Sequence, residues 1–559
     1  MMDGSEFAKA EQMAPGMEGI SKYMQALVET SGESSEELVE AVLHKTIEIL
    51  HAEGGASIIR LLGMIAIAPE GISTHALARV CPEINTLHIQ QVLCFLYDMV
   101  EETEKGRWTY RHSLYKECIR RLIGEETAVA YEEELYAYYK DSEECNWTEW
   151  IALGMALHKE ELAQLISEAI AKGDFTEEQF WSLVKSEQKE QNYFITLAGS
   201  TDDEGYVRSV LHGIDCDRLD WSEEIVALLK ALADDKFKEK ETQFYLYGAK
   251  AKLYQEFNLM KESRAYTEKQ YDIYKNIENI SKELLLEMVD ICVAGCCSYD
   301  LERGKVWWQR LSAVEKQFSA NFDDANEYVR LNEVLVWYWQ FLQHKEFGKE
   351  ENLKKLKELL DGAYSVYKVQ DNLNLYEQER PGHNEKCMKQ LAIFARNFAG
   401  IHLEKKAFGT AYPYAKIAYE ESKKAFLLNR TYNTAYLYCW NATNIMRCMK
   451  KDSDSRIQFY EEAHQALDWM DQQYVFPSTD ESRRYLYTLE AEGSKKMEML
   501  KKALEVSRRL YETFPEYNYE EWPLYDCRKY IEALFTKSEH LKFDEILEEF
   551  DKVIGIEKI

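Results

Sequence analysis

The fold is decided by residues 56–124, ASIIRLLGMIAIAPEGISTHALARVCPEINTLHIQQVLCFLYDMVEETEKGRWTYRHSLYKECIRRLIG. The first segment of this stretch carries apolar residues at helical spacing, at Ile58, Leu61, Leu62 and Ile65. Pro69 should end that helix, because proline lacks a backbone N–H donor. Ser73 is a favourable N-cap residue and predicts a short second helix that runs to Val80.

The second half of the stretch predicts a third helix, a hairpin and a closing helix. The third helix carries its apolar residues between Leu87 and Leu96. Val100–Thr103 and Trp108–Arg111 are strand-like runs on either side of Lys105-Gly106, a pair suited to a tight turn. Residues 112–123 are helical again, and the glycine that follows them favours a helix end. This order of elements predicts a winged helix.

The charges of the winged helix argue against DNA binding. A winged helix that binds DNA inserts its third helix into the major groove, where phosphate contacts need lysine or arginine. Neither residue occurs between Asn85 and Asp98, and the wing begins with Glu101, Glu102 and Glu104. We therefore expect no nucleic-acid partner for this module.

Two runs of this stretch resemble the winged-helix domain of STAND-type signalling NTPases. They are LLGMIAIAPEGISTHALARV and, after the hairpin, YRHSLYKECIRRL, and the resemblance is to the branch with tetratricopeptide-like repeats after the NTPase core. In that family a histidine at the exit of the wing can contact the nucleotide phosphate and hold the closed state. The resemblance implies this latent phosphate contact for His112, with Arg111 beside it. The alternative for His112 is a structural role, as a half-buried histidine that caps its own helix.

The phosphate loop of such an NTPase is missing from the sequence. No G-x-x-x-x-G-K-[ST] motif occurs in the chain. The resemblance therefore implies the C-terminal part of a STAND protein without its NTPase core. We expect no cofactor in this chain, and ATP or ADP only if the chain is joined to an NTPase core.

Composition favours a globular, nearly all-helical protein. Of 559 residues, 46% are hydrophobic and 30% are charged, while there are only 8 prolines and 25 glycines. The formal net charge of −31 disfavours nucleic acid and anionic membranes as partners. The 12 cysteines form no C-x-x-C pair, so the sequence predicts neither a metal site nor a redox motif. Scattered cysteines without a secretion signal indicate the cytoplasm, and no apolar run approaches the ~20 residues that span a membrane.

The pattern along the chain predicts an all-α protein: a winged helix with a small β-hairpin, followed by an α-solenoid of tetratricopeptide-like helix pairs. We expect a disordered or tag-like lead-in at 1–33, a helix plus the winged helix at 34–124, a helical connector at 125–236 and tetratricopeptide-like repeats at 237–559. The clearest repeat has Ala399 in a first helix and small or apolar residues in the second, at Phe408, Ala411, Ala415 and Ala418. A second repeat places Leu301, Gly304, Trp308 and Leu311 in its second helix.

Two aromatic stripes are candidates for protein binding, because tryptophan and tyrosine dominate binding hot spots. The first, VLVWYWQF at 334–341, contains Trp337 and Trp339, and the second, YNTAYLYCW at 432–440, contains Tyr436 and Trp440. Core packing is the alternative role for both. No catalytic motif occurs, so we expect no enzyme activity.

These observations predict a sensor or regulatory module of a STAND-like signalling or immune protein, an antiphage protein included. Such a module would recognise a protein or peptide along the groove of its solenoid and act with the NTPase core of a parent or partner protein. One alternative is a transcriptional regulator, in which the repeats control a DNA-binding winged helix. Another is a passive scaffold, which would show no triggered change when its partner binds.

Overall fold

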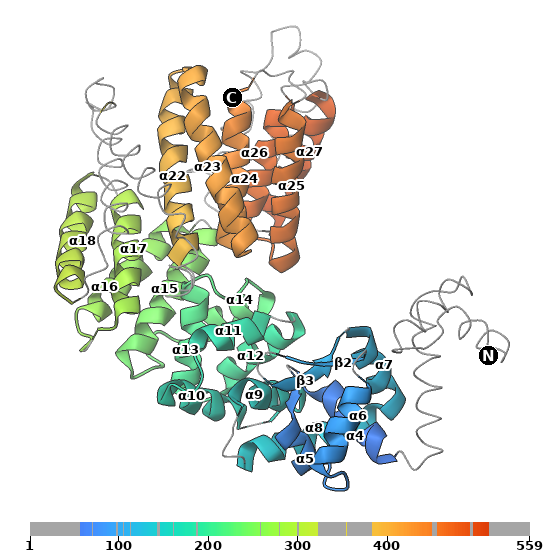
Figure 1. Ribbon diagram of the computed structural model, residues 1–559. Coiled ribbons are helices and arrows are strands. Elements are labelled where there is room, and N and C mark those ends of the chain that lie inside the picture. Colours follow the sequence, from blue (N-terminus) through green and yellow to red (C-terminus); the bar gives the residue numbers. More distant parts are fainter. Residues whose placement is uncertain are drawn as a thin grey trace, which may run out of the picture. The chain divides into compact units, whose positions relative to one another are not determined.

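The computed structural model describes residues 56–69, 71–96, 99–103, 106–111, 113–141, 146–159, 161–185, 188–257, 259–278, 280–298, 301–321, 354, 383–449, 455–491 and 496–513 (Figure 1). The predicted lead-in at 1–33, the helix expected from residue 34 and the aromatic stripe at 334–341 lie outside these residues. The chain divides into two compact units, residues 1–193 and 194–559. The division falls inside the stretch 125–236 that we expected to be a connector.

The first unit begins with the predicted winged helix and continues into further helices. Its elements are α4 (Ala56–Ile67), β1 (Ile72–Ser73), α5 (Thr74–Val80), α6 (Thr86–Phe95), β2 (Val100–Glu102), β3 (Arg107–Tyr110), α7 (Ser113–Ile123), α8 (Glu125–Asp141), α9 (Trp147–Ala156), α10 (Leu162–Lys172) and α11 (Glu177–Lys185). Ser73 caps α5 by accepting a hydrogen bond of 3.1 Å from the N–H of Ala76. Asn85 caps α6 in the same way through the N–H of His88, at 2.9 Å. These caps fix the starts of the second and third helices of the winged helix.

The sheet has one strand more than the hairpin that the sequence predicts. β1 pairs with β3 in an antiparallel ladder that places Ile72 opposite Trp108, and the strand order is β1-β3-β2. Gly71 precedes β1 with a φ of +95°, and a Cβ there would lie 2.8 Å from the carbonyl oxygen of Trp108. Only glycine fits this close approach. A strand of two residues has no periodicity of its own, so the sequence pattern could not predict it.

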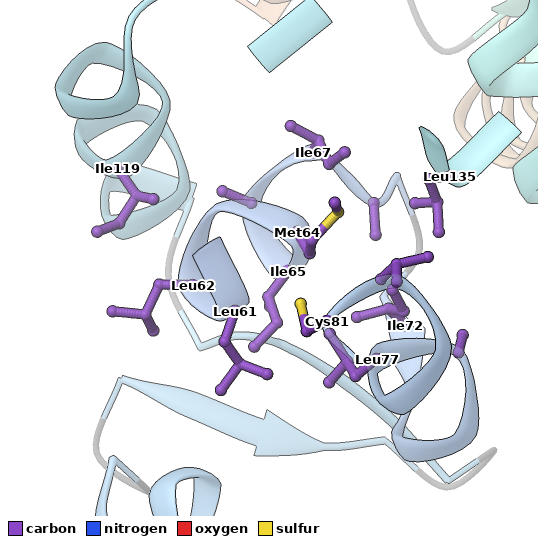
Figure 2. Packing of buried hydrophobic residues seen from close by; sticks show 14 of the residues in the cluster. Leu61, Leu62, Met64, Ile65, Ile67, Ile72, Leu77, Cys81, Ile119 and Leu135 are labelled. Carbon is purple, nitrogen blue, oxygen red and sulfur yellow. The ribbon is translucent and has the colours of Figure 1, made fainter. Parts of the chain in front are cut away.

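One hydrophobic core holds the winged helix together (Figure 2). Leu61 and Ile65 of α4 are buried in it against Leu77 of α5. Tyr110 of β3 buries its ring, and its hydroxyl donates a 2.9 Å hydrogen bond to the carbonyl oxygen of Leu62. The core continues through Leu135 of α8, so the helices after residue 124 pack as part of the same unit. Each large apolar side chain buried in this way contributes about 1.5–3 kcal/mol.

The second unit is built from helices alone within the part of it that the structure describes. They are α13 (Glu204–Asp215), α14 (Glu223–Ala231), α15 (Lys240–Glu256), α16 (Met260–Tyr274), α17 (Lys282–Ser298), α18 (Leu301–Asn321), α22 (His383–Glu404), α23 (Phe408–Leu428), α24 (Tyr432–Arg447), α25 (Ser455–Gln473), α26 (Pro477–Glu490) and α27 (Lys496–Thr513). α12 (Gln188–Ser200) crosses the division between the units. Consecutive helices pack in pairs, α15 with α16, α17 with α18, α22 with α23, α24 with α25 and α26 with α27 (Figure 1). The predicted class, an all-α winged helix followed by a helical solenoid, is confirmed.

Small residues lie where two paired helices approach each other. Ala399 of α22 and Ala411, Ala415 and Ala418 of α23 are fully buried, as predicted. Phe408, which we expected to share their face, is instead 46% exposed at the first residue of α23. In α18, Gly304 and Leu311 are buried as predicted, but Trp307 is buried where Trp308 was expected, and Trp308 is only half-buried. A Cβ on Gly295 would lie 2.3 Å from the Trp307 ring, so α17 leaves room for that ring.

None of the described helices combines the length and the apolar character that crossing a lipid bilayer requires.

Candidate functional site

The exit of the wing carries the residues that the resemblance assigned to a phosphate contact. His112 lies outside the described residues. The side chain of Arg111 is 48% exposed, and its guanidinium forms an ion pair of 3.4 Å with Glu101. Lys116 of α7 lies close in sequence to the wing exit, but its Nζ donates to the carbonyl oxygen of Ala68 at 3.0 Å, and burial lowers its pKa. Among the described residues at the exit of the wing, Arg111 therefore carries an exposed positive charge.

The third helix of the winged helix has the surface that the sequence predicted. α6 contains no lysine or arginine, and Leu87 on it is 66% exposed. Across the hairpin, Arg107 of β3 lies 4.0 Å from Glu149, a carboxylate of α9 that is fully buried. The guanidinium of Arg107 in the wing thus lies close to α9 of the same unit. α6 itself therefore offers no lysine or arginine for a contact with a DNA phosphate.

The first helices of the last repeats carry a row of aromatic side chains. Tyr436 and Trp440 of α24 lie one turn apart with ring centres 6.1 Å apart. Trp440 stacks on Tyr485 of the neighbouring first helix α26, at 5.3 Å and 22° between the rings. All three side chains are half-buried. We call Tyr436, Trp440 and Tyr485 the aromatic row. Tyr436 and Trp440 were predicted from the second aromatic stripe, and Tyr485 was not predicted.

Three ionisable side chains act on Tyr436 of the aromatic row. Burial is the main cause that raises the pKa of Tyr436, and Glu256 of α15 and Glu481 of α26 raise it further. Arg396 of α22 acts on the same hydroxyl in the opposite direction. Side chains of both signs from three different helices therefore act on one tyrosine. Such a mixture of aromatic and charged groups suits the recognition of a peptide with both apolar and charged side chains.

Local sequence sets the register of α24. Thr431 and Thr434 form a reciprocal capping box, in which Thr431 Oγ1 accepts from the N–H of Thr434 at 3.2 Å and Thr434 Oγ1 accepts from the N–H of Thr431 at 2.9 Å. The first residue of the helix, Tyr432, is buried and packs edge-on against Phe476 at 5.2 Å. Its hydroxyl also hydrogen-bonds Thr479 of α26. These contacts hold α24 and α26 side by side and so keep the aromatic row aligned.

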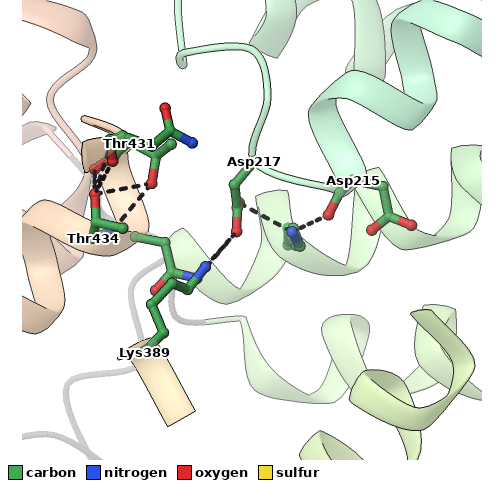
Figure 3. A network of polar contacts seen from close by, with 8 residues as sticks. Asp215, Asp217, Lys389, Thr431 and Thr434 are labelled. Carbon is green, nitrogen blue, oxygen red and sulfur yellow. Dashed lines mark hydrogen bonds and ion pairs between the residues drawn. The ribbon is translucent and has the colours of Figure 1, made fainter. Parts of the chain in front are cut away.

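A polar network centred on Asp217 ties the last repeats to α13 and α15 (Figure 3). Asp217 accepts from Lys252 of α15 at 3.0 Å and from Asn433 of α24 at 3.1 Å, and it forms an ion pair of 3.5 Å with Lys389 of α22. Burial alone would raise the pKa of Asp217, but Lys252, Lys389 and Asn433 outweigh it and the pKa is lowered. The backbone of Asp217 has a φ of +56°, a left-handed conformation that aspartate tolerates better than most residues.

Asp215 extends this network on the other side of Lys252. It accepts from Gln270 of α16 at 3.1 Å, and its backbone carbonyl accepts from Lys252. Its carboxylate lies directly over Gly248 of α15, where a Cβ would come within 2.2 Å of Oδ2. Burial raises the pKa of Asp215 to about 7.

Nothing in the local sequence marks this network. Lys389 and Asn433 follow Asp217 by 172 and 216 residues. The glycine at 248, inside a helical pattern, is the one local sign that a side chain approaches the helix closely there. Of the four predicted protein-binding residues, the structure brings Tyr436 and Trp440 together, and Trp337 and Trp339 lie outside the described residues.

No protein-family model and no curated protein matches this chain. Among solved structures, the chain is similar to the crystal structure of a Signal Transduction ATPase with Numerous Domains (STAND) protein with a tetratricopeptide repeat sensor from Pyrococcus horikoshii. The identity is 12%, the TM-score is 0.36, and the alignment covers 91% of this chain and 73% of the other.

Proposed function

We propose that this chain is the sensor and regulatory module of a STAND-like signalling protein. In this proposal it binds a protein or peptide through the aromatic row on α24 and α26, and it works in the cytoplasm without enzyme activity of its own. Immunity, including defence against phage, is the biological setting that the family resemblance favours. The proposal rests on the sequence resemblance of residues 61–122 and on the aromatic row.

The aromatic row is the observation that carries the proposal. Tyr436, Trp440 and Tyr485 are half-buried, so each residue keeps part of its surface exposed. They lie on the first helices of two neighbouring pairs, which we expect to line the inner face of the solenoid. Half-buried aromatic side chains flanked by charges are typical binding hot spots.

The winged helix would pass the signal to an NTPase core carried by a parent or partner protein. His112 and Arg111 would contact the phosphate of ATP or ADP bound to that core. Arg111 is exposed, but a phosphate would have to compete with Glu101 for it. Because the chain contains no phosphate-loop motif, we expect it to bind ATP or ADP weakly or not at all by itself. Calorimetry with the isolated chain tests this expectation, and tight nucleotide binding would contradict it.

The binding site is tested with peptides selected from a random displayed library by the full chain. Trp440→Ala and Tyr485→Ala should each lower the affinity for the selected peptides by about 30-fold or more, which is the effect of losing a hot-spot residue. Tyr412→Ala is the matched control, because Tyr412 is a 38% exposed tyrosine on α23, a second helix. Circular dichroism confirms that each variant is folded. Peptides that bind both row variants as tightly as the parent chain would disprove the assignment of the aromatic row.

Two further measurements separate this proposal from its alternatives. A transcriptional regulator would bind duplex DNA tightly at low salt and lose affinity steeply as salt rises, whereas we expect no such binding. A passive scaffold would change hydrogen exchange only where the peptide touches it. A sensor should also change the exchange of amides away from the aromatic row.

A further inference from the structure

Three potential metal ligands of different types converge between α13 and α17. His212 lies in the last turn of α13, Cys216 is the residue that follows this helix, and Glu287 projects from α17. His212 Nε2 lies 2.7 Å from Glu287 Oε1, and Cys216 Sγ lies 2.9 Å from the same oxygen. No two of the three ligand atoms are more than 4.8 Å apart. Within the described residues, no other group of three or more His, Cys, Asp or Glu side chains gathers in this way.

The surroundings hold these side chains in place. The His212 ring stacks on Tyr245 of α15 at 4.2 Å and 21°, which fixes the orientation of the imidazole. His212 is 9% and Glu287 is 7% exposed, whereas Cys216 is half-buried. Cys216 follows the last residue of α13 and lies between Asp215 and Asp217, so the Asp217 network fixes the turn that carries it.

Imidazole nitrogen, thiolate sulfur and carboxylate oxygen are the three donor types that zinc takes in proteins. Magnesium and calcium prefer oxygen ligands alone, so a thiolate argues against them. Zinc ligands at about 2.0–2.3 Å from the metal lie roughly 3.3–3.8 Å from one another. The two short contacts of Glu287 would therefore open by less than about 1 Å, a change within the reach of side-chain rotation.

We propose that His212, Cys216 and Glu287 bind a zinc ion, with water in the fourth position. Three bonds to the metal, from Nε2, Sγ and a carboxylate oxygen, replace the two hydrogen bonds that Glu287 accepts. When these bonds form, Cys216 releases its thiol proton to solvent, and His212 releases the proton on Nε2 while Nδ1 carries one, so that the bound imidazole is neutral. The thiolate and the carboxylate then balance the two charges of the ion. The sequence predicted no metal site because only the His212-x-x-x-Cys216 pair is local and the third ligand is 71 residues further on.

The zinc ion would link α13 to α17 across α15. Cys216 borders the turn whose Asp217 contacts Lys389 and Asn433 of the last repeats, so zinc would also stiffen the attachment of those repeats. This role is independent of the peptide-binding function proposed above. The chain would bind zinc whether or not the aromatic row binds a peptide.

The test uses the full chain, stripped of metal by a chelator that is then removed. Calorimetry with zinc should show one saturable site, and the midpoint of thermal unfolding should rise on zinc addition. Cobalt(II) should give the charge-transfer absorption of a cobalt–thiolate bond. Cys216→Ser keeps the size of the side chain and its hydrogen bond to Glu287, so this variant should fold normally. The variant should lose the cobalt–thiolate band, and its affinity for zinc should fall by at least about 100-fold.

His212→Gln is the second variant, and it should weaken zinc to a similar degree. Cys94→Ser is the matched control, because Cys94 is an exposed thiol on α6, and it should leave the affinity and the band unchanged. Zinc binding that survives both Cys216→Ser and His212→Gln, or a metal-free chain that shows no saturable zinc binding, would overturn the proposal. The second outcome would leave the cluster as a hydrogen-bonded link between two helices.

Discussion

Gly248 allows α15 to pack directly beneath the carboxylate of Asp215, and Gly248→Ala should break this contact. The new Cβ would lie 2.2 Å from Oδ2 and 2.4 Å from Cγ and Oδ1, well inside van der Waals contact. The carboxylate would have to retreat by about 1 Å. That movement would stretch its 3.1 Å hydrogen bond from Gln270. We therefore expect a local loss of stability.

The magnitude is the sum of three effects. Overpacking of this kind costs about 1–3 kcal/mol, and the lost hydrogen bond costs about 0.5–1.5 kcal/mol. Replacing glycine by alanine inside a helix returns about 1 kcal/mol. The expected net loss is about 0.5–3.5 kcal/mol. Since 1.4 kcal/mol corresponds to a tenfold change, amide hydrogen exchange limited by local opening of α15 should accelerate about 2- to 300-fold.

Hydrogen exchange followed by mass spectrometry measures this loss in the full chain. Gly400→Ala in α22 is the control, because a Cβ there meets nothing within 4 Å, so the variant should gain about 0.5–1 kcal/mol. Adding Asp215→Ala to Gly248→Ala removes the clashing carboxylate and should restore part of the loss. Exchange in α15 that is as slow in Gly248→Ala as in Gly400→Ala would refute the reasoning.

Two carboxyl groups in the second unit predict opposite pH effects on stability. Burial would raise the pKa of Glu462, but hydrogen bonds from Tyr419 and Tyr438 outweigh it and lower the pKa to about 2. The stabilisation that the ionised Glu462 carboxylate provides is therefore present at neutral pH and is lost as the pH falls from about 4.5 towards 2. Glu462→Gln should destabilise the chain at pH 7 and flatten its acid-unfolding profile, and an unchanged profile would contradict this. Burial raises the pKa of Glu256 to about 7. Between about pH 4.5 and 7 the folded chain therefore keeps a proton on Glu256 that the unfolded chain has lost. The free energy of unfolding falls as the pH rises through this range. Glu256→Gln can still accept from Ser478 and should raise the unfolding midpoint at pH 8 but not at pH 4, whereas a lower midpoint at pH 8 would contradict the assignment.

The winged helix was predictable because its signals are local. Ser73 and Asn85 each cap the helix that follows them, and a glycine at 124 with a φ of +78° ends α7. Periodicity and caps act within a few residues, so one sequence is enough to place these elements. β1 escaped prediction because a two-residue strand is defined only by its partner β3.

The sites depend on contacts between distant segments. The density of aromatic residues at 432–440 pointed to Tyr436 and Trp440, but only the packing of α24 against α26 added Tyr485. Periodicity alone could not decide which of two adjacent tryptophans in α18 faces the core, and the packing of α17 against α18 buries Trp307.

The sequence by itself determined the winged helix, the helical class of the repeats and the absence of cations from α6. The tertiary structure alone decided the meeting of Asp217 with Lys389, and of His212 and Cys216 with Glu287. The physical reason is the range of the interactions involved. The backbone hydrogen bonds of helices and the helix caps join residues three or four positions apart. Side-chain ion pairs and ligand clusters join whichever groups the packing of helices brings within a few ångströms.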